Sequence, residues 1–321
     1  MQVVQEKIVV LGTGGTIAGT AATPGDSLVY SSAQLGVAQL ADAATACAPG
    51  SVWMLETEQV AQIDSKDMSE ALWQTLAARC AHWLARPEVR GVVITHGTDT
   101  LEETAFFLDR VLAPAKPVVL TCAMRPATAL AADGPQNLLD AMAVAGTPGA
   151  SGVIAVCAGT VHSARDVAKE HPYRLDAFTS GEAGPLGVVE QGRLRMLREW
   201  PAPSTVLARR YARAVARATD WPRVEIVLNH AGATGALVQA LVVQGVDGLV
   251  AAGTGNGSLS TGLQAALLAA RAQGVAVVRA TRCARGQVLP HAGDLLPDSG
   301  GLSPVKARIA LMLDLLSVSD A

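Results

Sequence analysis

The chain alternates between two hydrophobic patterns along most of its length. Short runs rich in β-branched residues predict strands at residues 7–11, 91–94, 117–121, 152–156, 224–228, 248–251 and 274–278. Longer segments with alanine and leucine at helical spacing predict helices at residues 68–84, 101–112, 135–145, 235–244, 259–273 and 304–316. Because strands alternate with helices, we expect parallel sheets with helices as crossovers, and therefore an α/β protein.

One stretch interrupts this alternation. Residues 193–222 contain Pro201, Pro203, Pro222 and a run of arginines, which predicts a linker with one helix. We therefore expect two α/β domains. The larger N-terminal domain would span residues 1–200 and carry a parallel sheet, the linker residues 201–222, and a smaller C-terminal parallel-sheet domain residues 223–321.

Composition excludes several classes of protein. Half of the 321 residues are hydrophobic and 17% are charged, which predicts a large core and argues against a disordered chain. A net charge of −3 and only 3% aromatic residues argue against binding to nucleic acid. Polar residues and glycines interrupt the long uncharged runs, so no membrane span is expected. Residues 1–12 lack the pattern of a secretory signal, and we expect a cytoplasmic protein.

The usual metal and nucleophile motifs do not occur. The five cysteines form no CxxC pair and are expected to be small buried hydrophobic residues. The six histidines show no HxxH or HExxH spacing, so no metal site is predicted. A GxSxG serine elbow does not occur either. Any catalytic group therefore has to come from another residue type.

The loop after the first predicted strand is rich in glycine. It reads GTGGTIAG at residues 12–19, but Ile17 stands where a dinucleotide fingerprint requires glycine. No acidic residue follows at the end of a second strand, and no lysine follows a glycine as in a phosphate-binding loop. What remains is a tight turn that presents Thr16.

The loop after the second predicted strand reads THGTDT at residues 95–100. Thr100 with Glu103 fits a capping box for the helix that follows. That explanation leaves Thr98 and Asp99, a hydroxyl beside a carboxylate where a strand ends and a helix begins. The pair suits a nucleophile with a group that binds an ammonium, and a purely structural role is equally open.

Two further loops contain lysines, a rare residue here with five copies against twenty arginines. Ser65 precedes Lys66 and could cap a helix. Lys169 follows a predicted strand and turn. A lysine retained in an arginine-rich chain can serve where a group must lose its proton, which arginine cannot do, although a solvated charge is the simpler interpretation.

Taken together, these loops resemble the bacterial-type L-asparaginase family. The matching segments, in family order, are TGGTIAG at residues 13–19, DSKDM at 64–68, ITHGTDTLEETAFFL at 94–108, AMRP at 123–126, ADGPQNL at 132–138, RDVAK at 165–169 and GTGNG at 253–257. The resemblance implies a flavodoxin-like N-terminal domain and a homotetramer made of two intimate dimers, with each site at the intimate-dimer interface. It also implies hydrolysis of L-asparagine to L-aspartate and ammonia, without metal or cofactor.

The resemblance assigns catalytic roles by position. Thr16 matches the threonine that attacks the side-chain amide and forms a β-acyl-enzyme, and Tyr30 matches the tyrosine that contacts it. Thr98, Asp99 and Lys169 match a second triad, in which lysine acts as the base. The segment at residues 18–28 has the composition of a mobile lid.

Substrate-binding roles carry over in the same way. Ser65 matches a residue that holds the α-carboxylate, and Asp99 also takes the α-ammonium. Ala123 matches a residue whose carbonyl receives the leaving amide. Asn256 matches a polar residue that the neighbouring subunit supplies.

The chain departs from the family pattern at two places. Lys66 replaces a glutamine that accepts a hydrogen bond from the substrate ammonium, so we expect Lys66 to bind the substrate carboxylate or to turn toward Asp99. Secreted members carry a glutamate in the stretch that corresponds to residues 282–303, where this chain has none. Asp294 is the nearest acidic residue that could replace this glutamate and support the Thr16–Tyr30 pair. Water or His291 could give that support instead.

Other functions stay open at this level. An amidase subunit of a tRNA-dependent amidotransferase shares these motifs but carries an extra N-terminal domain. A non-catalytic amino-acid-binding protein would keep the pocket without needing both threonines and Lys169. A dehydrogenase would need the dinucleotide fingerprint that Ile17 interrupts. Minor activity on glutamine is compatible with the leading interpretation.

Overall fold

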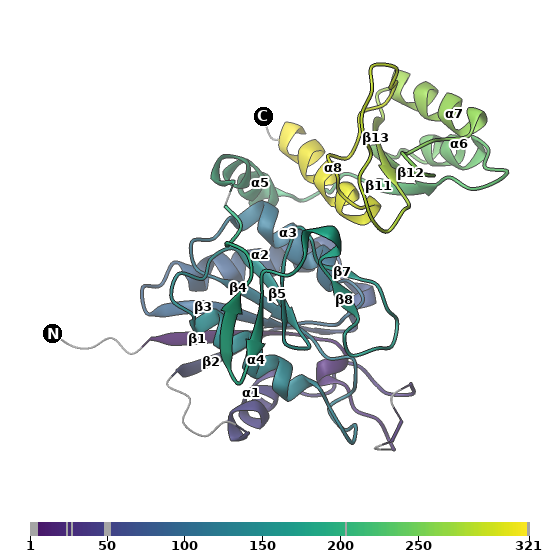
Figure 1. Ribbon diagram of the computed structural model, residues 1–321. Helices are drawn as coiled ribbons and strands as arrows, with labels where there is room; N and C mark the ends of the chain where they lie inside the picture. The colour runs from purple at the N-terminus through teal and green to yellow at the C-terminus, as the bar shows by residue number, and fades with distance from the viewer. Residues whose placement is uncertain (1–5, 24, 27, 48–52, 203, 320–321) are drawn as a thin grey trace. The chain divides into compact units, whose positions relative to one another are not determined.

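The computed structural model describes residues 6–319, except residues 24, 27, 48–52 and 203. Contacts divide the chain into two compact units, Met1–Ala208 and Arg209–Ala321. The division lies inside the stretch predicted as a linker, within helix α5 (Thr205–Arg217). Both units are α/β, each with its own sheet (Figure 1).

The described part of the first unit is built on an eight-stranded sheet with the order β10-β9-β6-β5-β4-β3-β1-β2. Five neighbouring strands are parallel: β1 (Lys7–Gly14), β2 (Met54–Ile63), β3 (Val89–Thr95), β4 (Val118–Thr121) and β5 (Val153–Cys157). Three antiparallel strands extend the sheet beyond β5: β6 (Thr160–Ser163), β9 (Gly187–Glu190) and β10 (Arg193–Met196).

Helices cover both faces of this sheet (Figure 1). Helices α1 (Val37–Ala46) and α4 (Gly134–Gly146) contact each other and pack on one face. Helices α2 (Glu70–Leu84) and α3 (Leu101–Leu112) pair on the other, where the rings of Trp73 and Phe107 stack with centroids 4.9 Å apart. Because both faces are buried, the central strands are apolar throughout, as the β-branched runs predict.

The second unit repeats this architecture on a smaller scale. Its three described strands are all parallel, in the order β11 (Val224–Leu228), β12 (Gly248–Gly253), β13 (Ala276–Thr281). Helix α8 (Pro304–Ser319) packs on all three strands, while α6 (Ala236–Val243) and α7 (Thr261–Ala272) pack against each other. The predicted fold class, two α/β domains with a smaller parallel sheet in the second, is confirmed.

The described elements also show what the hydrophobic pattern missed. Helix α1 and strand β2 were not predicted, and β2 lies at the edge of the sheet with its side chains mostly half-buried or exposed. Three of the five cysteines are buried as expected, and burial raises the pKa of the Cys80 thiol to about 12. Cys47 and Cys283 are exposed, so the expectation was wrong for those two.

The sheet places the motif loops along one edge. Thr16 follows β1, Ser65 follows β2, Thr98 follows β3 and Ala123 follows β4. In parallel sheets the carboxyl ends of neighbouring strands meet at the same edge, which is where ligands bind. The short hairpin of β7 (Ala168–Lys169) and β8 (Phe178–Thr179) adds Lys169.

Candidate active site

Glycines let three loops meet at this edge. Gly15 has a φ of 79°, and a Cβ built on it would overlap the backbone of Gly97. A Cβ on Gly97 would in turn overlap the hydroxyl of Ser65. Any larger residue at position 15 or 97 would therefore push apart the loops that follow β1, β2 and β3.

The first loop presents Thr16 at the start of the short helix η1 (Thr16–Ala18). Thr16 is buried, and its Oγ1 lies 2.7 Å from the Tyr30 hydroxyl, where either atom can donate. A long segment separates Thr16 from Tyr30 in the chain. Backbone hydrogen bonds between Thr20 and Ser31 close the base of this segment. The structure therefore brings the predicted Thr16–Tyr30 pair together.

The second group lies around Lys169. Its Nζ donates to Thr98 Oγ1 at 2.8 Å and to Asp99 Oδ1 at 2.7 Å. The Lys169 side chain is 16% exposed while that of Asp99 is 56% exposed, so the amine is enclosed and the carboxylate faces outward. The backbone N–H of Lys169 donates to Glu102 Oε1 at 3.3 Å, which ties the hairpin to the start of α3. An amine beside a hydroxyl is the arrangement that activates a nucleophile once the amine has lost its proton.

Ser65 and Thr100 link the loops that follow β2 and β3. Ser65 Oγ accepts from the Asp99 backbone N–H at 3.2 Å, and the Thr100 hydroxyl donates to the Ser65 carbonyl at 2.7 Å. The predicted capping box at Thr100 is wrong, since its hydroxyl serves this link and caps no helix. The N-cap alternative for Ser65 is wrong too, because Asp64 and Ser69 cap the helices that follow.

Behind Thr98 lies a buried hydrogen-bonded chain that the sequence interpretation missed. Trp73 Nε1 donates to Thr104 Oγ1 at 2.9 Å, and Thr104 Oγ1 lies 3.0 Å from His96 Nε2. His96 Nδ1 lies 2.7 Å from the Gly97 carbonyl, which can only accept. His96 Nδ1 is therefore the donor in this contact, and in the neutral imidazole Nε2 accepts from the Thr104 hydroxyl. Burial lowers the pKa of His96 to about 4, consistent with that form.

The loop after β4 is held by Asp133. Its two oxygens accept from the backbone N–H groups of Met124 at 2.9 Å and Arg125 at 3.0 Å. Asn137 Nδ2 donates to Asp133 and to the Cys122 carbonyl. Ala123 is fully buried between these anchors. Asp133 and Asn137 belong to the ADGPQNL motif, and that motif was the signal that could have identified them as positioning residues.

These groups enclose a cavity of about 220 Å³. Its lining includes Thr16, Tyr30, Ser65, Thr98, Asp99 and Lys169, together with Leu28, Asp64, Met124, Pro172 and Tyr173. All five predicted catalytic residues therefore face one cavity. Size and chemistry fit a small amino acid, because the lining offers hydroxyls, an amine and carboxylates at short range.

Lys66 does not take the position expected for it. Its side chain is 65% exposed, and Nζ pairs with Asp64 Oδ2 at 3.2 Å. The hydrogen bond that Lys66 donates to Asp64 raises the pKa of Lys66, with smaller contributions from Asp67 and Asp99. Of the two partners expected for Lys66, Asp99 is therefore not the one that its ammonium pairs with, because Asp64 lies only two residues away. Binding of the substrate carboxylate by Lys66 stays a prediction.

The two candidates from the second unit have local partners. Asn256 Nδ2 donates to the Leu289 carbonyl at 2.9 Å, and Asn256 Oδ1 accepts from the Leu289 N–H at 2.7 Å. Asp294 pairs with Arg279 at 2.6 Å and lies 3.2 Å from the His291 ring. The backbone N–H of His291, which donates to Asp294 at 2.9 Å, lowers the pKa of Asp294 most, and Arg279 lowers it further. A contribution of Asn256, Asp294 or His291 to catalysis stays a prediction.

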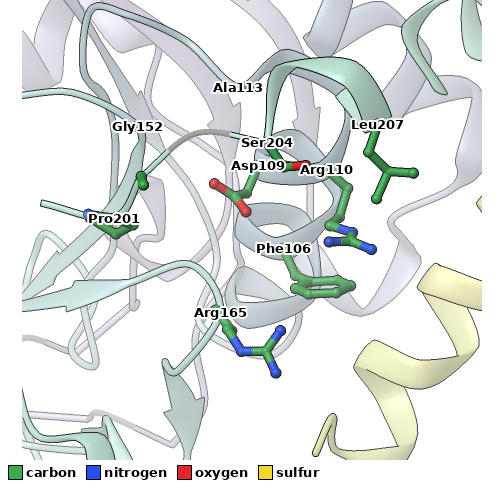
Figure 2. Close-up of a pocket in the computed structure, with 10 residues that line it drawn as sticks. Phe106, Asp109, Arg110, Ala113, Gly152, Arg165, Pro201, Ser204 and Leu207 are labelled. Atoms are coloured by element: carbon green, nitrogen blue, oxygen red, sulfur yellow. The ribbon is translucent and has the colours of Figure 1, made fainter. Parts of the chain in front are cut away.

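A second cavity, of about 190 Å³, lies at the opposite end of α3 from Thr98. Figure 2 shows Asp109, Arg110 and Phe106 of α3 together with Arg165 and Leu207 around it. None of the described residues that line it is a threonine or lysine. It therefore lacks the hydroxyl–amine pair that distinguishes the first cavity.

The described residues contain no group of three or more His, Cys, Asp or Glu side chains placed to hold a metal ion. None of the helices in the described ranges combines the length and hydropathy that a membrane crossing requires.

Comparison with known proteins finds matches to both units of the chain. A family model described as asparaginase, N-terminal, matches residues 7–202, and one described as glutaminase/asparaginase C-terminal domain matches residues 223–320. L-asparaginase 2 of Escherichia coli (strain K12) is 38% identical over 98% of this chain and 90% of its own length. Glutaminase-asparaginase of Pseudomonas fluorescens biotype A is 37% identical over 98% and 87%.

A solved structure agrees with this match. The crystal structure of a probable cytoplasmic L-asparaginase from Campylobacter jejuni superposes with a TM-score of 0.88 at 34% sequence identity, over 97% of this chain and 95% of its own. The resemblance found in the motifs is confirmed across both units. The chain belongs to the asparaginase family.

Proposed function

We propose that this protein hydrolyses L-asparagine to L-aspartate and ammonia, with weaker activity on L-glutamine. One observation carries the proposal: the Lys169 amine donates to Thr98 and Asp99 in the same cavity that holds the Thr16–Tyr30 pair. An amide is a poor electrophile, so a weak hydroxyl needs a nearby base and a preorganised site. The names of the relatives, L-asparaginase and glutaminase-asparaginase, support both substrates.

The proposed chemistry proceeds in two halves. Thr16 Oγ1 attacks the side-chain carbonyl carbon, its proton leaves through the Tyr30 hydroxyl, and the amide nitrogen gains a proton and departs as ammonia. Water then attacks the β-acyl-enzyme and releases L-aspartate with the Thr16 hydroxyl restored. Thr98 and Lys169 deliver and accept the protons. The α-ammonium of an incoming substrate would take over Asp99 from Lys169.

The remaining residues bind and orient the substrate. Ser65 holds the α-carboxylate, and Lys66 adds a positive charge at the rim. The carbonyl of Ala123 receives the amide N–H groups of the substrate. We further propose a homotetramer in which Asn256 of a neighbouring copy completes each site, and a cytoplasmic enzyme. The name of the structural relative, a probable cytoplasmic L-asparaginase, supports the second proposal.

Ammonia release from asparagine and glutamine over a range of concentrations tests the proposal. Wild-type protein should release ammonia from asparagine with the higher kcat/KM, while Thr16→Ala and Thr98→Ala should each lose activity by two or more orders of magnitude. Lack of ammonia from either substrate in the wild type would overturn the function. Full activity in one variant would overturn the role of that threonine alone.

A further inference from the structure

Besides its catalytic groups, the cavity has a wall made by a loop whose function is not assigned. Pro172 and Tyr173 line the cavity, and both belong to residues 170–177, which connect β7 to β8. The same hairpin carries Lys169, which pairs with Phe178 in the β7–β8 ladder. The distance from the amine to this wall is therefore set within one short hairpin.

A single histidine organises this loop. His171 Nδ1 lies 3.1 Å from the Tyr173 N–H and 2.9 Å from the Arg174 N–H, so it accepts from both. The N–H groups of Glu170 and His171 both donate to the Ala177 carbonyl, which closes the base of the loop. A side-chain acceptor that binds the N–H groups two and three residues on is the construction of an Asx turn, here made by an imidazole.

Tyr173 depends on this turn for its position. Tyr173 is 58% exposed, whereas Ala177 at the base of the loop is buried. A half-exposed ring is not fixed by surrounding core packing, so the backbone that His171 holds determines where the ring lies. The other apolar residues of the lining are Leu28, in the segment predicted to be a lid, and Met124, which has three rotatable bonds. The side chains of Tyr173 and Pro172 are stiffer than these two.

We propose that Tyr173 is a specificity-determining residue that restricts the length of the amide side chain the cavity accepts, and that His171 is the positioning residue that holds it in place. The inference rests on the proposed function. The α-groups of the substrate are anchored near Ser65 and Asp99, and its amide must reach Thr16. With both ends anchored, the extra methylene of glutamine has to bulge sideways, against the wall.

The proposed role of Tyr173 is tested by the ratio of kcat/KM for asparagine to kcat/KM for glutamine. One methylene in a pocket is worth about 10- to 200-fold in kcat/KM. Tyr173→Ala should lower the ratio about 10-fold, mainly through a lower KM for glutamine, while Tyr173→Phe should keep it near the wild-type value. Leu175→Ala is the matched control, since Leu175 lies on the same loop outside the cavity lining and is partly exposed.

The role of His171 has its own comparison. His171→Ala removes the acceptor and should lower the ratio in the same direction as Tyr173→Ala. His171→Asn should restore it, because an asparagine carbonyl accepts from the same two N–H groups in an Asx turn. A structural role without effect on the cavity would instead lower the thermal midpoint and leave the ratio unchanged, which would overturn the assignment of His171.

The outcomes separate this inference from the proposed function. A wild-type protein that releases no ammonia from either substrate overturns both. An active wild type together with an unchanged ratio in Tyr173→Ala overturns the wall alone, and so does an equal loss of kcat on both substrates. Thermal unfolding of each variant checks that it is folded, and the exposure of Tyr173 makes a large loss of stability unexpected.

Discussion

The amine of Lys169 illustrates how one residue depends on partners that are remote in the chain. Its two side-chain partners, Thr98 and Asp99, lie 71 and 70 residues before it. Considered alone, Thr98 is a candidate nucleophile. Its hydrogen bond with the enclosed amine of Lys169 fits a role in proton transfer better than the role of nucleophile. The attacking hydroxyl would then be that of Thr16, which lies beside Tyr30. We therefore propose different roles for the two threonines, because their nearest partners differ: Tyr30 for Thr16 and Lys169 for Thr98.

Replacing Lys169 tests this division of roles. Lys169→Met removes the amine that serves Thr98, and we expect kcat on asparagine to fall by about 10²- to 10⁴-fold, the usual worth of a general base. Lys7→Met is the matched control, since Lys7 also forms one ion pair, with Glu56 at 3.0 Å, but lies outside the cavity lining. Steady-state ammonia release measures both variants. Similar activity in the two variants would contradict a catalytic role for Lys169.

His96 makes a second prediction at this scale, about pH and stability. Its pKa falls from 6.5 to about 4 on folding because burial disfavours the charged form. The unfolded chain therefore binds the proton more tightly. The stability that the neutral imidazole contributes is complete above pH 6.5 and is lost as the pH falls toward 4, in total on the order of 3 kcal/mol.

Urea unfolding of wild type and His96→Gln between pH 7 and pH 4 measures this effect. Glutamine can donate and accept like the neutral imidazole but does not titrate in this range. The free energy of unfolding of the wild type should therefore fall more steeply with decreasing pH than that of the variant. Parallel curves would show that His96 is not the group responsible.

At the scale of elements, the site is a junction of loops at one edge of a sheet. Strands β1, β2, β3 and β4 end there in parallel register, and each supplies one segment of the cavity. Gly15 and Gly97 allow these segments to approach until backbone contacts side chain. The hairpin of β7 and β8 then adds Lys169, together with Pro172 and Tyr173 from its connecting loop. The catalytic geometry thus depends on short connections between elements that are themselves rigid.

A glycine substitution tests the junction. Gly15→Ala should destabilise the fold by more than the about 1–3 kcal/mol typical of a residue held in such a sparsely populated backbone conformation, because its Cβ would also overlap Gly97. Gly149→Ala is the control, with a similar φ of 80° but no atom within 4 Å of the added Cβ. Urea unfolding and activity together distinguish them. Equal stability losses and full activity in both variants would contradict the role of the close approach.

At the scale of the molecule, the chain consists of two units with separate cores. The described residues that line the candidate cavity all belong to the first unit, whereas the second unit holds Asn256 and the Asp294–Arg279 ion pair. In the proposed assembly, sites would be completed between copies, so that a single chain would be poorly active. The inward-facing ion pair at Asp294 leaves Asn256 as the better candidate for such a contribution.

The assembly makes a prediction about mass and activity. We expect sedimentation to give four times the chain mass of 32.9 kDa, and activity per chain to fall on dilution into the range where the tetramer dissociates. Asn256→Ala should raise KM without preventing assembly. A monomer with full activity would rule out sites shared between copies.

The sequence by itself determined most of the central elements and the residues of the site. Buried parallel strands are continuous apolar runs, and long helices repeat their apolar positions, so both patterns are local and visible without a structure. Strand β2 was missed because an edge strand carries polar side chains on both faces. Helix α1 was missed although its buried residues, Val37, Leu40, Ala41 and Ala44, follow helical spacing. The motifs identified Thr16, Thr98 and Lys169 through their resemblance to a family.

The tertiary structure alone decided which partner each polar group has. Thr100 links two loops where the sequence predicted a helix cap. Lys66 pairs with Asp64, where the sequence predicted the substrate carboxylate or Asp99 as its partner. The chain from Trp73 through Thr104 to His96 joins residues up to 31 positions apart, and no local pattern encodes it. Hydrophobic periodicity reports only which face of an element is buried. Hydrogen-bond partners depend on which elements become neighbours, and that is a property of the folded chain.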